Sequence, residues 1–163
     1  MPLFRFARRG ANWEEDLPIE ELQKREFKSK HGGPDLRPSV YELDGQTGPL
    51  LRAYAEHAHH IDPPTRALAI ESSVKDRAVQ TTPGKLAFAF VRDQHREILL
   101  NDEADLLALI SELVAKGGEG RIPIPKQDVI AYARQRIEEH DPEWTAAAAA
   151  PDARSWLIKL RKP

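Results

Sequence analysis

Three histidines within four residues, His57, His59 and His60, are the side chains in this sequence best suited to chemistry. In a helix, His57 and His60 would share a face, so that one metal ion could bridge their rings. The H-E-x-x-H spacing typical of helical zinc sites is absent. Histidine also suits the negatively polarised end of a helix. We therefore expect a solvated helix end without a metal, and keep a metal-dependent enzyme at His57 and His60 as an alternative.

The other catalytic templates each lack an essential part. No serine lies in the G-x-S-x-G turn that presents a nucleophilic serine. Gly117 and Gly118 follow a predicted helix rather than a strand, and Glu119 beside them would repel a phosphate. Cysteine is absent, which excludes disulfides, thiol nucleophiles and thiolate metal sites. We therefore predict no catalytic residue, no cofactor and no bound metal, and favour a protein that is not an enzyme.

Two segments, one near each end of the sequence, combine basic with aromatic side chains. Tryptophan and arginine are the residue types that most often carry binding energy at protein interfaces. We therefore predict a non-enzymatic protein-interaction or regulatory module with another protein as its partner, and leave homo-oligomerisation open. The predicted partner-binding residues are Phe4, Arg5, Arg8, Arg9, Trp156, Lys159 and Arg161.

Each of these segments has alternative interpretations. The N-terminal segment can stack on nucleic-acid bases, add a strand to a partner's sheet, or join the sheet of this protein itself. In the C-terminal segment, Trp156 can instead dock in the core while the neighbouring cations stay solvated. A nucleic-acid-binding regulator would use Arg5, Arg8 and Arg9 together with a helix over residues 126–140.

The charge balance argues against a dedicated nucleic-acid domain. The 163 residues carry 24 basic and 26 acidic side chains, a formal net charge of -2, whereas such domains usually show a basic excess. Arginines interrupt the apolar residues of the N-terminus, and no apolar run is long enough to span a membrane. We therefore expect a cytoplasmic protein without membrane contact, and the composition, rich in alanine, arginine and proline, indicates a bacterial one.

The elements that must position these side chains follow a mixed order of helices and strands. We predict strands near residues 38–43 and 65–74, and a hairpin over residues 86–100 because Phe88 and Phe90 alternate with small residues. Helices are predicted over residues 50–61, from Asp102 to the glycines at 117–118, and over residues 126–140 and 153–161. This order predicts an α+β fold with a small, mostly antiparallel sheet covered by the C-terminal helices. We expect one domain over residues 17–163, preceded by an arm, residues 1–16, that can be flexible.

Overall fold

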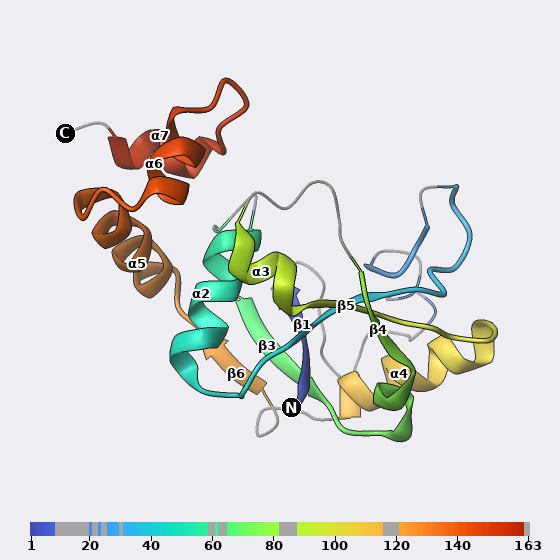
Figure 1. Cartoon of the computed structure of the whole chain (residues 1–163). Helices are drawn as coiled ribbons and strands as arrows, with labels where there is room; N and C mark the ends of the chain where they lie inside the picture. Colours follow the sequence, from blue (N-terminus) through green and yellow to red (C-terminus); the bar gives the residue numbers. More distant parts are fainter. Residues whose placement is uncertain are drawn as a thin grey trace.

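The protein is built around an antiparallel sheet of six strands, with helices on both faces (Figure 1). The computed structural model describes residues 1–8, 20, 23, 26–29, 31–58, 61, 65–81, 88–115 and 121–161. The strand order is β4-β5-β2-β1-β3-β6, and every pairing is antiparallel. The strands are β1 (Leu3–Arg8), β2 (Ser39–Glu42), β3 (Thr65–Ile70), β4 (Ala78–Gln80), β5 (His95–Ile98) and β6 (Arg121–Ile124). The α+β class predicted from the sequence is confirmed.

The helices divide unequally between the two faces of the sheet. They are α2 (Thr47–His57), the 3-10 helix η2 (Ser73–Arg77), α3 (Ala89–Gln94), α4 (Glu103–Ala115), α5 (Lys126–Glu138), α6 (Pro142–Ala149) and α7 (Ser155–Arg161). Helix α4 packs on one face, where its buried side chains Leu106, Ile110 and Leu113 join Leu68 and Ile70 of β3 in one core cluster. Helices α2, α3, α5, α6 and α7 contribute to a second cluster on the other face. On this second face α2 and α3 contact the sheet, and the C-terminal helices extend the same cluster by packing on α2 and on one another, while α4 covers the first face.

The N-terminal segment lies inside the sheet. Strand β1 pairs with β3 along its whole length, from Leu3 opposite Ile70 to Arg8 opposite Thr65. Alternation of its side chains sends Phe4 into the cluster under α2 and Leu3 into the cluster under α4. Of the three interpretations of this segment, the structure shows the one in which it joins the protein's own sheet. Residues 9–16 of the predicted arm lie outside the described residues.

The hairpin predicted over residues 86–100 is wrong. Residues 89–94 form helix α3, and β5 pairs with β2 and β4 instead. The buried Phe88 and Val91 are three residues apart, which is helical spacing, and Phe88 packs on Trp144 with ring centroids 4.7 Å apart. A run of six residues is too short for periodicity to separate a buried helix from a buried strand.

Both edge strands lie between the elements predicted above, in segments for which no strand was expected. Strand β6 contains Pro123, which cannot donate to a ladder and is tolerated because β6 lies at the edge of the sheet. Strand β4 has three residues and follows η2, so its apolar pattern is too short to be recognised.

A tight corner joins α5 to α6. The main-chain N–H of Asp141 donates to Arg136 O at 3.0 Å, and that of His140 donates to Ile137 O at 3.1 Å, the pattern of a Schellman motif. His140 has φ 58° in this motif, a position that favours glycine. The Asp141 side chain then caps α6 by accepting from the N–H of Glu143 at 3.1 Å, and Pro142 begins the helix.

Replacing His140 by glycine should stabilise the protein. A non-glycine residue in the left-handed conformation costs about 1 kcal/mol, so we expect His140→Gly to raise the free energy of unfolding by roughly 0.5–1 kcal/mol. Denaturant unfolding of both proteins measures the difference. The neighbouring Glu139→Gly is the control: Glu139 has φ -79°, so glycine there should lower the free energy of unfolding. Equal or lower stability of His140→Gly would contradict this account of the corner.

Candidate functional site

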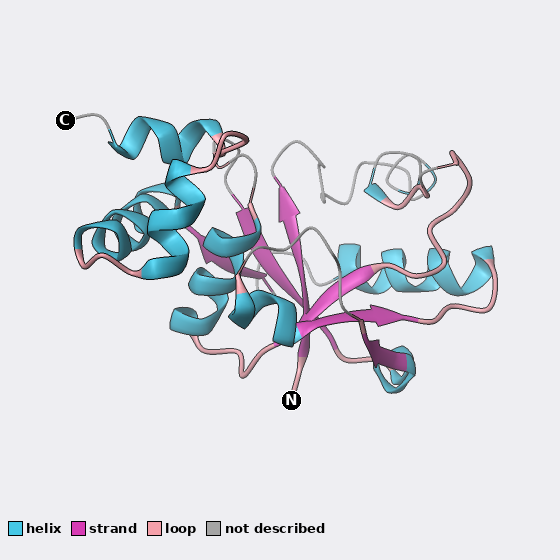
Figure 2. Ribbon diagram, turned by 45° about the horizontal axis from the view of Figure 1, so that its top comes forward, coloured by secondary structure: helices cyan, strands magenta, loops and turns pink. Residues whose placement is uncertain are grey.

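The sheet opens between β1 and β2. The two strands pair only at Leu3 opposite Glu42 and Phe4 opposite Tyr41, although β1 continues to Arg8. In an antiparallel ladder, every second pair of opposite residues is joined by main-chain hydrogen bonds. The N–H of Leu43 donates to Pro2 O at 3.1 Å, so the next hydrogen-bonded pairs in this register are Phe4 with Tyr41 and Phe6 with Ser39. Phe6 and Ser39 do not pair, and β1 and β2 diverge beyond Phe4 (Figure 2).

The side chain of Arg5 supplies a hydrogen-bond donor to Ser39 in place of the missing main-chain pairing. Its Nη1 donates to Ser39 O at 2.9 Å, and its Nη2 donates to Glu26 O at 3.0 Å. The guanidinium also stacks over the ring of Phe27, with its central carbon 4.1 Å from the ring centroid. The Ser39 carbonyl therefore takes its hydrogen bond from a side chain instead of from the neighbouring strand.

A pocket of about 320 Å³ lies at this opening, near the lower end of the volumes usual for ligand sites. Strands β1 and β2 supply two of its walls, and the C-terminal end of α2 supplies a third. Cationic, carboxylate, hydroxyl, imidazole and aromatic groups meet in it. The lining residues are Arg5, Phe6, Glu26, Ser39, Tyr41, Tyr54, His57 and Ala58.

Aromatic rings form one side of the pocket. The Phe6 ring centroid lies 5.5 Å from that of Tyr41 and 5.4 Å from that of Tyr54. The Tyr41 hydroxyl lies 2.8 Å from Nδ1 of His57. Burial raises the pKa of Tyr41 above its ordinary value, while Arg5 and Arg154 oppose that rise more weakly. The phenol therefore stays protonated at neutral pH, and the tautomer of His57 decides which of the two groups donates.

Arg5 has acids in its neighbourhood but no ion-pair partner in the part of the chain that the structure describes. Among the described residues, no carboxylate lies within ion-pair distance of its guanidinium, whose two bonds go to neutral carbonyls. Burial lowers the pKa of Arg5, and the more distant Asp35 and Glu26 oppose this effect. A partly buried cation without an ion-pair partner is unfavourable, so an anionic group beside Arg5 would be stabilised.

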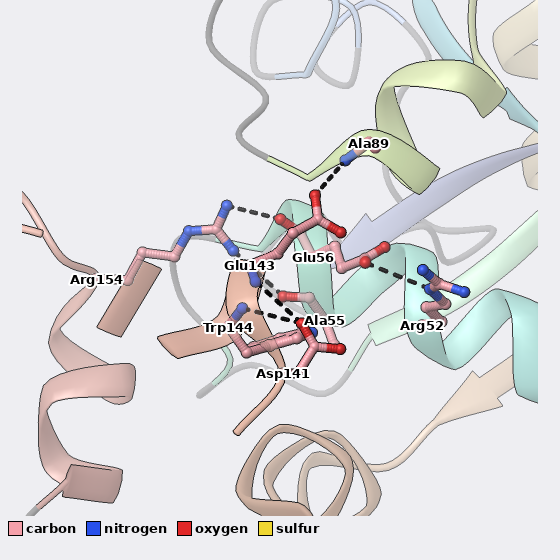
Figure 3. A network of polar contacts seen from close by, with 8 residues as sticks. All are labelled: Arg52, Ala55, Glu56, Ala89, Asp141, Glu143, Trp144 and Arg154. Carbon is pink, nitrogen blue, oxygen red and sulfur yellow. Dashed lines mark hydrogen bonds and ion pairs between the residues drawn. The ribbon is translucent and has the colours of Figure 1, made fainter. Parts of the chain in front are cut away.

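The end of α2 beside the pocket is held by residues around α7. Arg154 donates to the carbonyls of Ala55 at 3.2 Å and Glu56 at 2.7 Å (Figure 3). It also donates to the carbonyl of Ala58 at 3.0 Å. Nε1 of Trp156 donates to Ala58 O at 3.1 Å. These bonds satisfy the last carbonyls of the helix and fix the wall that carries Tyr54 and His57.

A buried carboxyl group lies on the other side of the same helix. The Glu56 side chain is 1% exposed; its Oε1 accepts from Nε of Arg52 at 3.3 Å, and its Oε2 has no partner among the described residues (Figure 3). Burial raises the pKa of Glu56 to about 7, with smaller contributions in the same direction from Glu143 and Asp141, while Arg52 opposes the rise. Glu56 is therefore partly protonated at neutral pH.

The predicted partner-binding residues fall into different environments. Phe4 and Trp156 are 3% and 7% exposed and pack in the same core cluster. Arg5 lines the pocket, Arg8 belongs to β1, and Lys159 is exposed on α7. Arg9 and the side chains of Arg8 and Arg161 lie outside the described part of the chain. Helix α2 links the two segments, because Trp156 donates to the carbonyl of Ala58, and Ala58 lines the pocket together with Arg5. The partner-binding role of the two segments stays a prediction.

Of the pocket residues, Arg5 and His57 were candidates from the sequence and the others were missed, although the sequence held one signal for the pocket itself. Arg5 lies between Phe4 and Phe6 in β1, and a cation enclosed in this way needs internal partners. Nothing local connects Tyr41 with His57, which meet only through the packing of α2 on the sheet.

The two alternative functions rest on residues that the structure separates or does not describe. His57 is hydrogen-bonded to Tyr41, His60 is not described, and the described residues contain no group of three or more metal-ligating side chains. Helix α5 exposes Lys126 and Arg134 but also Asp128 and Glu138, and Arg5 faces the pocket instead of joining them. Both alternatives stay predictions.

Comparison with known proteins adds no relative: no family model, no curated protein and no solved structure matches this chain. In the part of the chain that the structure describes, no helix has the length and apolar character needed to cross a bilayer. The case for function therefore depends on the pocket itself.

The raised pKa of Glu56 predicts how stability changes with pH. Between pH 4.5 and about pH 7 the unfolded chain loses a proton that the folded protein keeps, so the free energy of unfolding falls across this window. Glu56→Gln should remove this fall and stabilise the protein above pH 7 by roughly 1–3 kcal/mol. Unfolding measured at a series of pH values tests this.

The exposed Glu138→Gln on α5 is the matched control and should leave the pH profile unchanged. If Glu56→Gln has the same pH profile as the unaltered protein, the Glu56 carboxyl is not the group that holds the extra proton.

Proposed function

We propose that this protein is a non-enzymatic binding module that holds an acidic group of another protein in the pocket between β1 and β2. The observation that carries the proposal is the guanidinium of Arg5, which lines a pocket and has no carboxylate within ion-pair distance among the described residues. A carboxylate in the pocket would supply the missing negative charge and accept a charge-assisted hydrogen bond.

The other groups of the pocket support binding over catalysis. Tyr41 keeps its proton and is therefore a poor base. In the tautomer in which Nδ1–H of His57 donates to the phenol, the phenol O–H can donate to a bound oxygen. The ring of Phe6 lies beside Tyr41 and gives an apolar surface next to the cation. A carboxylate flanked by apolar groups, as in a short protein segment, fits such a mixture better than a strongly hydrated inorganic ion.

A regulatory role and a bacterial, cytoplasmic setting belong to the same proposal. They rest on the composition, which lacks cysteine and is rich in alanine, arginine and proline. Nucleic acid is the alternative partner, and binding to it would weaken steeply with added salt.

Selection from a library of short random peptides tests the proposal. We expect the selected peptides to carry a carboxylate and to bind Arg5→Met at least about tenfold more weakly, because a hydrogen bond to a charged group contributes roughly 1.5–3 kcal/mol. The control is Arg134→Met, which removes an exposed arginine on α5 and should leave the affinity unchanged. Calorimetric titration gives the affinities, and thermal unfolding verifies that each variant is folded.

Tyr41→Phe provides a second variant if Arg5→Met does not fold. It keeps the ring and removes the hydroxyl that lines the pocket, so it should also weaken binding. Peptides that bind Arg5→Met and Tyr41→Phe as tightly as the unaltered protein would overturn the proposal.

A further inference from the structure

On the edge of β1 that faces the pocket, no described strand pairs with the main chain beyond Phe4. Residues of an antiparallel strand turn their N–H and C=O groups alternately to one side and the other. Pro2 and Phe4 turn theirs toward β2, so Phe6 does the same. Among the described residues, none pairs with the main chain of Phe6 on this side. The pocket therefore offers a hydrogen-bond donor and an acceptor at the spacing of a β-ladder.

The opening between the strands is closed at one end. Phe4 pairs with Tyr41. Toward the N-terminus from Phe4, Leu3 lies opposite Glu42, and the N–H of Leu43 donates to Pro2 O, so β1 and β2 stay joined there. An extended chain that lies along Phe6 between the two strands cannot continue past Phe4. Such a chain has to end in the pocket.

The side chain next to the closed end determines which end of a chain fits. Arg5 follows Phe4 directly, and its guanidinium reaches the opening at Ser39 O. A cation at this place matches the negative carboxyl terminus of a chain and repels the positive amino terminus. A chain with its carboxyl terminus toward Phe4 runs antiparallel to β1, the direction that β2 takes at the paired end.

The size and lining of the pocket agree with a short terminal segment. About 320 Å³ accommodates the last one or two residues of a chain, and the aromatic rings of Phe6 and Tyr54 can contact an apolar last side chain. Peptide recognition by strand addition combines main-chain hydrogen bonds with side-chain pockets in this way.

Building on the proposed function, we propose that the pocket binds the free carboxyl terminus of a partner protein in an extended conformation. The terminal carboxylate lies on Arg5, and the last main-chain amide pairs with Phe6 on the edge of β1. An internal aspartate or glutamate has the same charge, and the test separates the two sources.

Two synthetic libraries of short random peptides, identical except at the last group, provide the test. One library ends in a carboxylate and the other in a carboxamide, and both contain aspartate and glutamate inside the sequence. We expect binders from the carboxylate library alone, with affinity reduced at least about tenfold by Arg5→Met and retained by Arg134→Met. Amidation of a selected peptide should cause a similar loss.

The outcomes separate this inference from the proposed function. Binders from the carboxamide library that need Arg5 and an internal acidic residue would overturn the terminal mode and leave the proposed function standing. The absence of any Arg5-dependent binder in both libraries would overturn both. Tyr41→Phe again replaces Arg5→Met if the latter does not fold.

Hydrogen exchange of single amides tests the strand pairing. In the protein alone, the N–H of Phe6 should exchange faster than that of Phe4, which is paired with Tyr41. Addition of a selected carboxylate peptide should slow exchange at Phe6 by at least about tenfold and leave Phe4 as the reference. Unchanged exchange at Phe6 in the peptide-bound protein would overturn the extended binding mode even if the carboxylate still needs Arg5.

Discussion

The hydrogen bond from Arg5 to the carbonyl of Ser39 is the interaction on which the central part of this protein depends. It replaces the rung that would join Phe6 to Ser39 and lets β1 and β2 separate. A hydrogen bond to a charged group contributes roughly 1.5–3 kcal/mol against about 0.5–1.5 kcal/mol for a neutral one, and stacking on Phe27 adds to it. The sheet can therefore open without a large loss of stability, and the opening becomes a pocket.

The same pocket depends on residues that do not line it. Arg154 and Trp156 bind the last carbonyls of α2, and this helix carries Tyr54 and His57 to the pocket. An arginine and a tryptophan near the end of a chain are readily interpreted as an interface. Here their polar groups are used inside the molecule, as supports for a helix end.

The sequence predicts elements whose pattern is long and regular. The apolar stripe of α4 is recognised because Leu106, Ile110 and Leu113 repeat at helical spacing, and all three are buried. The six residues of α3 do not extend far enough to show a period, and tertiary packing on Trp144 decides their conformation. The pocket is harder to predict from the sequence than α3, because Tyr41 and His57 meet through tertiary packing and not through local spacing. In the sequence, Arg5 between Phe4 and Phe6 is the feature that indicates the pocket.

Strand β1 joins two groups of strands, β4-β5-β2 and β3-β6, and contributes side chains to the core clusters on both faces. Its partners come much later in the chain: Leu3 lies opposite both Glu42 and Ile70. Folding must therefore close large loops before the central strand is paired on either side, and such non-local pairing makes folding slow. Neither half of the sheet is complete before the other, so the two halves should form together as one cooperative unit.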